Sequence, residues 1–256
     1  MKASFLNHSK PLLTAMVQDG TPEAAICTIG DSIFDGADAL GIQLCNFKRE
    51  YRTEEYLKPV FRSCMGRPSY ITSYRGRESA GMTDEACVDL LLMGLRCGGT
   101  LCDVMGDLYD PVENQMSFNP DAVAKQKDLI AQIHDMGGEV LMSAHLHGFY
   151  EEPQILDFAF AQQERGADIV KLVSRAQTEE EMMADFQIIR SLKKNLRVPF
   201  LFLASGPYSR LLRQVGPSFG CCMYLCVQRY HPVTTKDQPI LHAMRAVRDN
   251  IYLPME

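Results

Sequence analysis

Long apolar runs are missing from this chain of 256 residues, and several classes of protein are excluded with them. No run approaches the ~20 apolar residues that a membrane-spanning helix needs. Residues 1–18 carry only one short apolar stretch, so the long apolar segment of an export signal is absent as well. We therefore expect no membrane partner and a cytoplasmic location.

The chain also lacks metal-binding spacing among its nine cysteines. Structural zinc and iron–sulfur sites space their cysteines in short, recognisable motifs. Here Cys221, Cys222 and Cys226 lie inside one apolar run, where cysteine usually behaves as a small hydrophobic residue. Nine cysteines without an export signal favour a reducing compartment. We expect neither a metal nor another cofactor.

A surplus of basic residues is absent too, because 26 Lys and Arg face 32 Asp and Glu, for a net charge of −6. Nucleic-acid and anionic-membrane partners are usually bound by a basic patch, so neither is expected. No Pro/Gly/Ser-rich hinge or low-complexity segment divides the chain. With 46% hydrophobic residues, residues 1–256 are predicted to form a single domain.

Eight short apolar runs recur along the chain, each rich in Ile, Val, Leu or Cys. Runs that are apolar on both faces are typical of parallel strands covered on both sides. The eight predicted strands are Ala24–Ile29, Ala39–Leu44, Ser69–Tyr74, Thr100–Met105, Glu139–Ala144, Asp168–Val173, Phe200–Ala204 and Cys221–Val227.

Helical patterns follow seven of these runs. They are Glu54–Cys64, Thr83–Arg96, Asp121–Met136, Pro153–Arg165, Glu179–Lys194, Ser209–Val215 and Gln238–Ile251. After the first predicted strand only Asp31–Gly36 is available, so that crossover should be short or irregular. Strands alternating with helices predict an α/β fold, here a (β/α)8 TIM barrel, which commonly has about this length.

Lys171 interrupts the apolar strand Asp168–Val173. Burying an ammonium is costly, so a lysine in such a strand tends to find a partner or to lose its proton. A neutral lysine attacks carbonyl groups and forms a Schiff base. The alternative is a lysine at the strand end whose amine extends to water.

Polar residues follow other predicted strands, and a barrel places its chemistry at these carboxyl ends. His145 and His147 follow the fifth strand, while Arg75 and Glu78 follow the third. One mouth could thus hold a lysine, histidines, an arginine and a carboxylate. This set suits Schiff-base chemistry with proton abstraction beside a carbonyl, because histidine exchanges protons near neutral pH.

Most of the chain resembles the type I 3-dehydroquinate dehydratases, which are Schiff-base barrels. Ala167–Lys171 matches the family's lysine after an Ala-Asp-Ile-x run, and Met142–His145 matches its histidine at the end of the fifth strand. His147–Phe149 with Pro153 matches the family's next motif instead, so either histidine could be the counterpart. Both lie on one face of an extended strand. We favour His145, because strand register should be firmer than loop register.

The strongest downstream match is Gly206 followed by Arg213–Gly220, at the family's own interval. By resemblance, Arg213 would bind the substrate carboxylate, and Gln238 and Thr234 would be polar substrate contacts from the last loop. Arg75 and Glu78 are similar to the family's arginine and acid after the third strand; an exposed ion pair is the alternative.

The resemblance implies that Lys171 forms an imine and that His145 or His147 moves the proton beside it. It also implies a lyase that removes water from a small-molecule cyclic 3-oxo acid, in the shikimate pathway of aromatic amino acid biosynthesis, and it suggests a homodimer.

The second strand departs from the family, which has Glu-x-Arg there, both facing the substrate. Gln43 and Cys45, or Gly41 and Gln43, stand in this place, and the family's Asp-x-Glu on the fourth strand becomes Asp103–Met105. A network missing such members should not hold the same ring hydroxyls equally well. A divergent member, a related aldolase or isomerase acting on another oxo-acid, and a non-catalytic barrel therefore all remain open.

Overall fold

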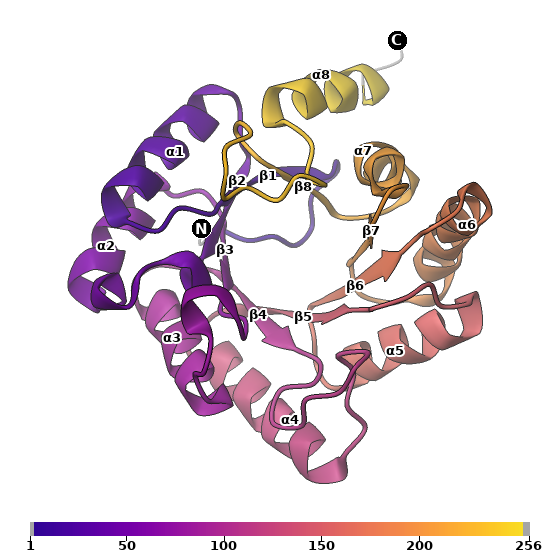
Figure 1. Ribbon diagram of the computed structural model, residues 1–256, viewed down its shortest axis with the longest axis horizontal. Coiled ribbons are helices and arrows are strands. Elements are labelled where there is room, and N and C mark those ends of the chain that lie inside the picture. The colour runs from indigo at the N-terminus through magenta and orange to yellow at the C-terminus, as the bar shows by residue number, and fades with distance from the viewer. Residues whose placement is uncertain (1–2, 253–256) are drawn as a thin grey trace.

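The computed structural model describes residues 3–252, apart from the side chain of Arg77. Eight parallel strands form one sheet and a helix follows each strand, which confirms the predicted (β/α)8 barrel (Figure 1). The strands are β1 (Leu12–Val17), β2 (Ala39–Gln43), β3 (Ser69–Thr72), β4 (Leu101–Met105), β5 (Glu139–His145), β6 (Ile169–Arg175), β7 (Phe200–Ser205) and β8 (Met223–Cys226).

The main helices lie outside the sheet (Figure 1). They are α1 (Pro22–Phe34), α2 (Glu54–Ser63), α3 (Asp84–Arg96), α4 (Pro120–Asp135), α5 (Glu152–Glu164), α6 (Glu179–Asn195), α7 (Ser209–Phe219) and α8 (Leu241–Ile251). Three short 3-10 turns are η1 (Leu44–Asn46), η2 (Arg49–Tyr51) and η3 (Arg77–Ser79). Among residues 3–252, no helix is both long and apolar enough to cross a membrane.

The first strand was predicted in the wrong place. Ala24–Ile29 lies inside α1, and the strand is Leu12–Val17, all six residues of which are buried. Thr21 accepts a hydrogen bond from the Ala24 N–H, and Pro22 occupies the first turn, so the helix begins with residues that are typical of a helix N-terminus. The crossover is therefore a regular helix of 13 residues rather than a short or irregular one.

Most other helix ends lie within one or two residues of their predicted positions. Thr83 caps α3 by accepting from the Ala86 N–H, and Gly137, at φ +76°, follows the end of α4. The last two helices differ more. Helix α7 continues to Phe219, and α8 begins at Leu241 rather than Gln238.

The sheet runs in the order β7-β6-β5-β4-β3-β2-β1-β8, with every pair parallel. No ladder between β7 and β8 is present among the described residues. The backbone N–H of Cys222, just before β8, donates to the carbonyl of Phe200 on β7 at 2.9 Å. The barrel is therefore nearly closed, and its eight carboxyl ends meet around one mouth.

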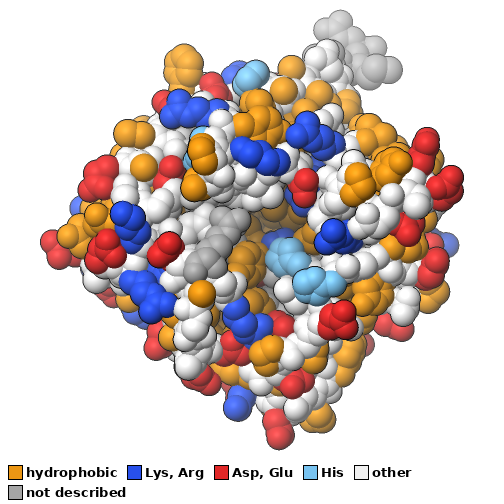
Figure 2. Space-filling model, viewed as in Figure 1, with side chains coloured by type: hydrophobic (Ala, Val, Ile, Leu, Met, Phe, Trp, Pro, Cys, Tyr) orange, Lys and Arg blue, Asp and Glu red, His pale blue; other side chains and the backbone are white. Residues whose placement is uncertain are grey.

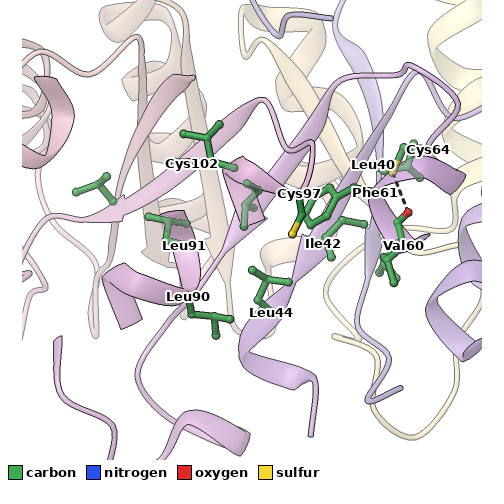
Figure 3. Close-up of a cluster of buried hydrophobic side chains, with 14 of the residues drawn as sticks. Leu40, Ile42, Leu44, Val60, Phe61, Cys64, Leu90, Leu91, Cys97 and Cys102 are labelled. Carbon is green, nitrogen blue, oxygen red and sulfur yellow. Dashed lines mark hydrogen bonds between the residues drawn. The ribbon is translucent and has the colours of Figure 1, made fainter. Parts of the chain in front are cut away.

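An apolar layer separates the sheet from its helices. Figure 3 shows part of it, where Leu40 and Ile42 of β2 pack with Phe61 of α2 and Leu91 of α3, all of them buried. Because side chains alternate along a strand, Gln43 points the opposite way, into the barrel. The outer face of β2 thus anchors the strand, and its inner face is available to a site.

Candidate functional site

A cavity of about 490 Å³ opens at the carboxyl ends of the strands. Figure 2 shows it as a hollow in the centre of one face, bordered by basic and histidine side chains. Its walls come from every strand or from the segment that follows it. They are formed by Met16, Gln43, Cys45, Tyr70, Thr72, Tyr74, Arg75, Met105, Gln115, His145, Leu146, His147, Lys171, Val173, Arg175, Leu203, Ser205, Arg213, Leu225, Thr235, Asp237 and Gln238.

Lys171 reaches this cavity from the middle of β6 and is only 3% exposed. Parallel pairing places it between Ser143 of β5 and Leu201 of β7. Alternation turns Lys171 and Val173 inward, and both line the cavity. The amine therefore does not extend to bulk water, and it must be satisfied by partners inside the barrel.

Three oxygen atoms surround the Lys171 amine. Nζ donates to the hydroxyls of Tyr74 at 2.8 Å and Tyr70 at 3.0 Å, and to Oδ2 of Asp103 at 3.2 Å. Both tyrosine hydroxyls also donate to Oδ2 of Asp103, and the Ser143 hydroxyl donates to Oδ1. We call Lys171, Tyr70, Tyr74, Asp103 and Ser143 the lysine side of the cavity.

Burial and charge act in opposite directions on this amine. Desolvation lowers the pKa of Lys171, and the carboxylate of Asp103 opposes that shift. Burial, followed by the charge of Asp103, raises the pKa of Tyr70 and Tyr74 well above the ordinary tyrosine value. Both phenols are therefore neutral hydroxyls, and the lysine loses its proton more easily than a lysine in water.

His145 lies at the end of β5 beside the lysine side. Its ring meets the Tyr74 ring edge to face, with 5.3 Å between centroids. Nδ1 lies 3.1 Å from Oε1 of Gln115, an atom that only accepts, so Nδ1 carries the proton and Nε2 keeps a free lone pair. Burial, followed by the charge of Lys171, lowers the pKa of His145 to about 3. The imidazole is thus neutral at physiological pH and can act as a base.

His147, the other candidate histidine, also lines the cavity but is exposed. Among the described residues no hydrogen bond fixes either of its ring nitrogens. The structure therefore places both histidines at the mouth, with His145 held beside the amine and His147 at the rim.

Arg213 enters the cavity from α7, on the side opposite β3 and β4. Its Nε donates to the carbonyl of Ala204 at 2.7 Å, and only 7% of the residue is exposed. Burial lowers the pKa of Arg213 to about 10, and Asp237 opposes this shift. The guanidinium is still charged at neutral pH. Its two terminal nitrogens make no hydrogen bond within residues 3–252, so they can bind a carboxylate.

Three buried acceptors on the cavity wall have no hydrogen-bond partner in the described chain. They are Oε1 of Gln43, Oγ1 of Thr72 and Oε1 of Gln238. A buried acceptor without a partner costs free energy, which a ligand hydroxyl or amine could recover. We call Gln43, Thr72, Gln238 and Arg213 the binding side of the cavity.

The other predicted contacts lie less directly on the cavity. Arg75 lines it, but its guanidinium is paired with Asp84 at 2.6 Å and Asp107 at 2.9 Å, not with Glu78. Burial lowers the pKa of Arg75, but the hydrogen bonds and charges of Asp84 and Asp107 together outweigh burial. The pKa of Arg75 is therefore raised above its ordinary value. Glu78 is exposed in η3 and is not among the lining residues.

Thr234 likewise lies behind the wall, with its hydroxyl bonded to the backbone of His231. The adjacent Thr235 lines the cavity instead, held by Gln18, whose Nε2 donates to its hydroxyl and whose Oε1 accepts from its N–H. A shift of one residue in a loop thus changes which hydroxyl faces the site.

Several wall residues were not predicted as site residues. Tyr70, Thr72 and Tyr74 share one face of the third predicted strand, so their spacing of two was a usable signal. Asp103, which lies behind the wall, was noted only as part of the fourth-strand segment Asp103–Met105 and not as a site residue. Gln115 comes from the loop between β4 and α4, and nothing local indicates that it reaches His145. Among the described residues, no group of three or more His, Cys, Asp or Glu is placed to hold a metal ion.

Fold and site together define a (β/α)8 barrel with a buried lysine in a cavity at its carboxyl end. Residues 38–247 match the family described as type I 3-dehydroquinase, and the chain belongs to that family. A curated relative, the 3-dehydroquinate dehydratase of Aromatoleum aromaticum, is 25% identical over 187 residues, or 69% of this chain. The chain spans 65% of the length of that relative.

Solved structures support the same fold at lower identity. The 3-dehydroquinate dehydratase of Geobacillus kaustophilus is 16% identical, with a TM-score of 0.81 over 96% of this chain and 93% of the other. The type I enzyme of Clostridium difficile, solved with covalently modified comenic acid, is 15% identical, with a TM-score of 0.80 over 95% and 93%. The chain is thus a divergent member of its family.

Proposed function

We propose that this protein is a Schiff-base lyase in which Lys171 forms an imine with a small cyclic 3-oxo acid and water is then eliminated. The observation that carries the proposal is the Lys171 amine, buried at the wall of a 490 Å³ cavity beside a neutral imidazole. A deprotonated lysine attacks the carbonyl carbon, and the resulting iminium acidifies the neighbouring C–H bond.

In this proposal His145 moves the second proton. The lone pair on Nε2 accepts the proton from the carbon beside the iminium, and the electron pair forms the new double bond as hydroxide leaves. The protonated imidazole returns that proton to the leaving oxygen, so one water molecule is released. Gln115 is a positioning residue, because its acceptor at 3.1 Å holds the required tautomer.

Arg213 would bind the carboxylate of the acid. Its terminal nitrogens are free for a bidentate contact, and its burial strengthens each charge-assisted hydrogen bond. A carboxylate held there fixes the oxo group relative to Lys171, which converts the attack into an intramolecular step.

The first candidate substrate is 3-dehydroquinate, named by the curated relative and by the structural neighbours. We expect weak turnover, because Gln43 and Cys45 replace a charged acid and an arginine that the family uses on the second strand. A second candidate is an aldolase or isomerase reaction on a less hydroxylated oxo-acid. The neutral wall formed by Gln43, Cys45 and Met105 favours it.

The test is to add 3-dehydroquinate to the purified protein and follow the ultraviolet absorbance of the conjugated enone that dehydration produces. An increase that Lys171→Met abolishes supports the proposal. Absorbance that stays flat, combined with a lysine that no oxo-acid modifies, would reject it. Modification without an enone would favour the second candidate.

We further infer a place in aromatic amino acid biosynthesis, a reducing cytoplasm and a homodimer. All nine cysteines are free thiols, as a reducing compartment requires. Tyr208, Leu211 and Phe219 expose apolar area on or beside α7, which a second subunit could cover. Light scattering on the purified protein decides between monomer and dimer.

A further inference from the structure

The hydroxyl of Tyr74 lies beside the Lys171 amine at the wall of the cavity. It accepts from Nζ at 2.8 Å, donates to Asp103, and belongs to a side chain that lines the cavity. The Tyr74 and His145 rings also pack edge to face, with 5.3 Å between their centroids. Tyr74 therefore contacts both groups that the proposed reaction uses.

Forming an iminium from a protonated lysine requires two proton transfers. The ammonium carries three protons and the iminium nitrogen keeps one, so the other two must leave with the carbonyl oxygen as water. In the resting site the three ammonium protons are directed at Tyr70, Tyr74 and Asp103. A carrier must then pass protons from one of these positions to the substrate oxygen.

His145 is poorly suited to this first step. Its Nδ1 is bonded to Gln115, and within residues 3–252 none of its hydrogen bonds reaches Lys171. Asp103 is also a poor carrier, because Tyr70, Tyr74, Ser143 and Lys171 already surround both of its oxygens. Tyr70 and Tyr74 both line the cavity, but Tyr70 is fully buried, whereas Tyr74 is partly exposed to solvent.

We propose that Tyr74 is a catalytic residue that relays protons between the Lys171 amine and the substrate carbonyl oxygen; this rests on the function proposed above. As Nζ gives a proton to the phenol oxygen, the O–H proton of Tyr74 passes to the carbonyl oxygen. Two such transfers turn the carbonyl oxygen into water while nitrogen and carbon form the iminium. The phenol is a neutral hydroxyl before and after each transfer.

Asp103 orients the relay. At rest it accepts the Tyr74 proton, and when a carbonyl oxygen enters the cavity that proton can turn toward the substrate. Asp103 then still holds the donors from Tyr70 and Ser143, so its charge stays satisfied. The reverse sequence of transfers returns the lysine when the product imine is hydrolysed.

The experiment compares Tyr74→Phe with Tyr70→Phe, since each variant removes one hydroxyl from the same amine and the same carboxylate. Imine formation is measured by rapid mixing with 3-dehydroquinate and quenching with borohydride, followed by intact-mass analysis. We expect Tyr74→Phe to slow imine formation by about 10²-fold or more, and Tyr70→Phe by less than about tenfold. The dissociation constant of the substrate should change little in Tyr74→Phe.

A second measurement removes the risk that either variant is merely misfolded. Fluorinated tyrosine incorporated at position 74 keeps the hydroxyl and the packing but makes the phenol more acidic. A relay predicts that the rate of imine formation and its solvent isotope effect shift, whereas a structural hydroxyl predicts no change.

Three outcomes would overturn the inference. One is a Tyr74→Phe protein that forms the imine within threefold of the wild-type rate. Another is an equal loss in the two phenylalanine variants, and the third is a fluorinated protein with unchanged kinetics. A wild-type protein that no oxo-acid modifies would instead remove the proposed function, which separates the two failures.

Discussion

On the lysine side of the cavity each polar group has a partner, whereas on the binding side three acceptors have none. Asp103 receives donors from Tyr70, Tyr74, Ser143 and Lys171. Oε1 of Gln43, Oγ1 of Thr72 and Oε1 of Gln238 receive no donor within the described residues. The lysine side is thus organised before a ligand arrives, while the binding side keeps hydrogen bonds available for one.

This division does not coincide with the resemblance to the family, because Arg213 and Gln238 on the binding side also match family positions. By resemblance, Lys171 and His145 match family motifs, while Gln43 and Cys45, or Gly41 and Gln43, stand where the family has charged residues. Reaction chemistry depends on a few fixed atoms, whereas recognition depends on which hydroxyls the wall can bind. The chemistry can therefore stay constant while the substrate changes.

Removing the nucleophile should have the largest effect. Lys171→Met should lower any turnover by more than about 10⁴-fold, because no second amine lines the cavity among the described residues. Lys127→Met, at an exposed position on α4, is the matched control and should retain wild-type activity. Steady-state assays of both variants check this, and appreciable activity in Lys171→Met would contradict the assignment.

Substituting the two histidines should lower kcat to very different extents. His145→Gln should lower kcat by about 10²–10⁴-fold, and His147→Gln by less than tenfold, because only His145 is held beside the amine. Since burial lowers the pKa of His145 to about 3, the wild-type rate should show no loss near pH 6.5 as the solution is acidified. Equal losses in the two variants, or an inflection near pH 6.5 that His145→Gln removes, would argue against this base.

Restoring charge to the binding side should have an intermediate effect. The double variant Gln43→Glu with Cys45→Arg should raise kcat/KM for 3-dehydroquinate by about 10–100-fold, because each buried charge-assisted hydrogen bond is worth about 1.5–3 kcal/mol. Steady-state kinetics of both proteins decide the matter. If the wild-type enzyme is fast and the double change impairs it, this chain recognises the same substrate through other residues.

The smallest expected effects are on the free energy of unfolding, and they compare a hydroxyl on the lysine side with one on the binding side. Ser143→Ala removes the donor to Oδ1 of Asp103 and should lower the free energy of unfolding by about 1–3 kcal/mol. Thr72→Val removes a hydroxyl that has no partner, so it should be neutral or slightly stabilising. Urea unfolding of the two variants tests this, and an equal loss in both would mean that the two sides do not differ as described.

Much of the fold follows from local pattern alone. Strands such as Asp168–Val173 are apolar on both faces, and Thr83 and Gly137 mark helix ends through their capping chemistry. The run Ala24–Ile29 was wrongly predicted to be a strand, because a short apolar run fits a buried strand and one face of a helix equally well. There the capping by Thr21 and Pro22 was the better signal.

The site was only partly predictable, for a related reason. Lys171 and His145 lie on strands, whose register fixes their direction. The position of Gln115, and the presence of Thr235 rather than Thr234 on the wall, depend on loop conformations that local sequence does not determine. The partners of Arg75 come from α3 and from the loop after β4, and such long-range pairing is not visible in one sequence.

The most direct test of the account is peptide mapping after borohydride reduction with 3-dehydroquinate and a panel of other oxo-acids. The account predicts one reduced adduct per chain, located on the peptide that contains Lys171 and absent from Lys171→Met. The mass of the adduct also identifies which acid was bound. An adduct on another lysine, or no adduct with any acid in the panel, would contradict the claim that Lys171 forms the imine.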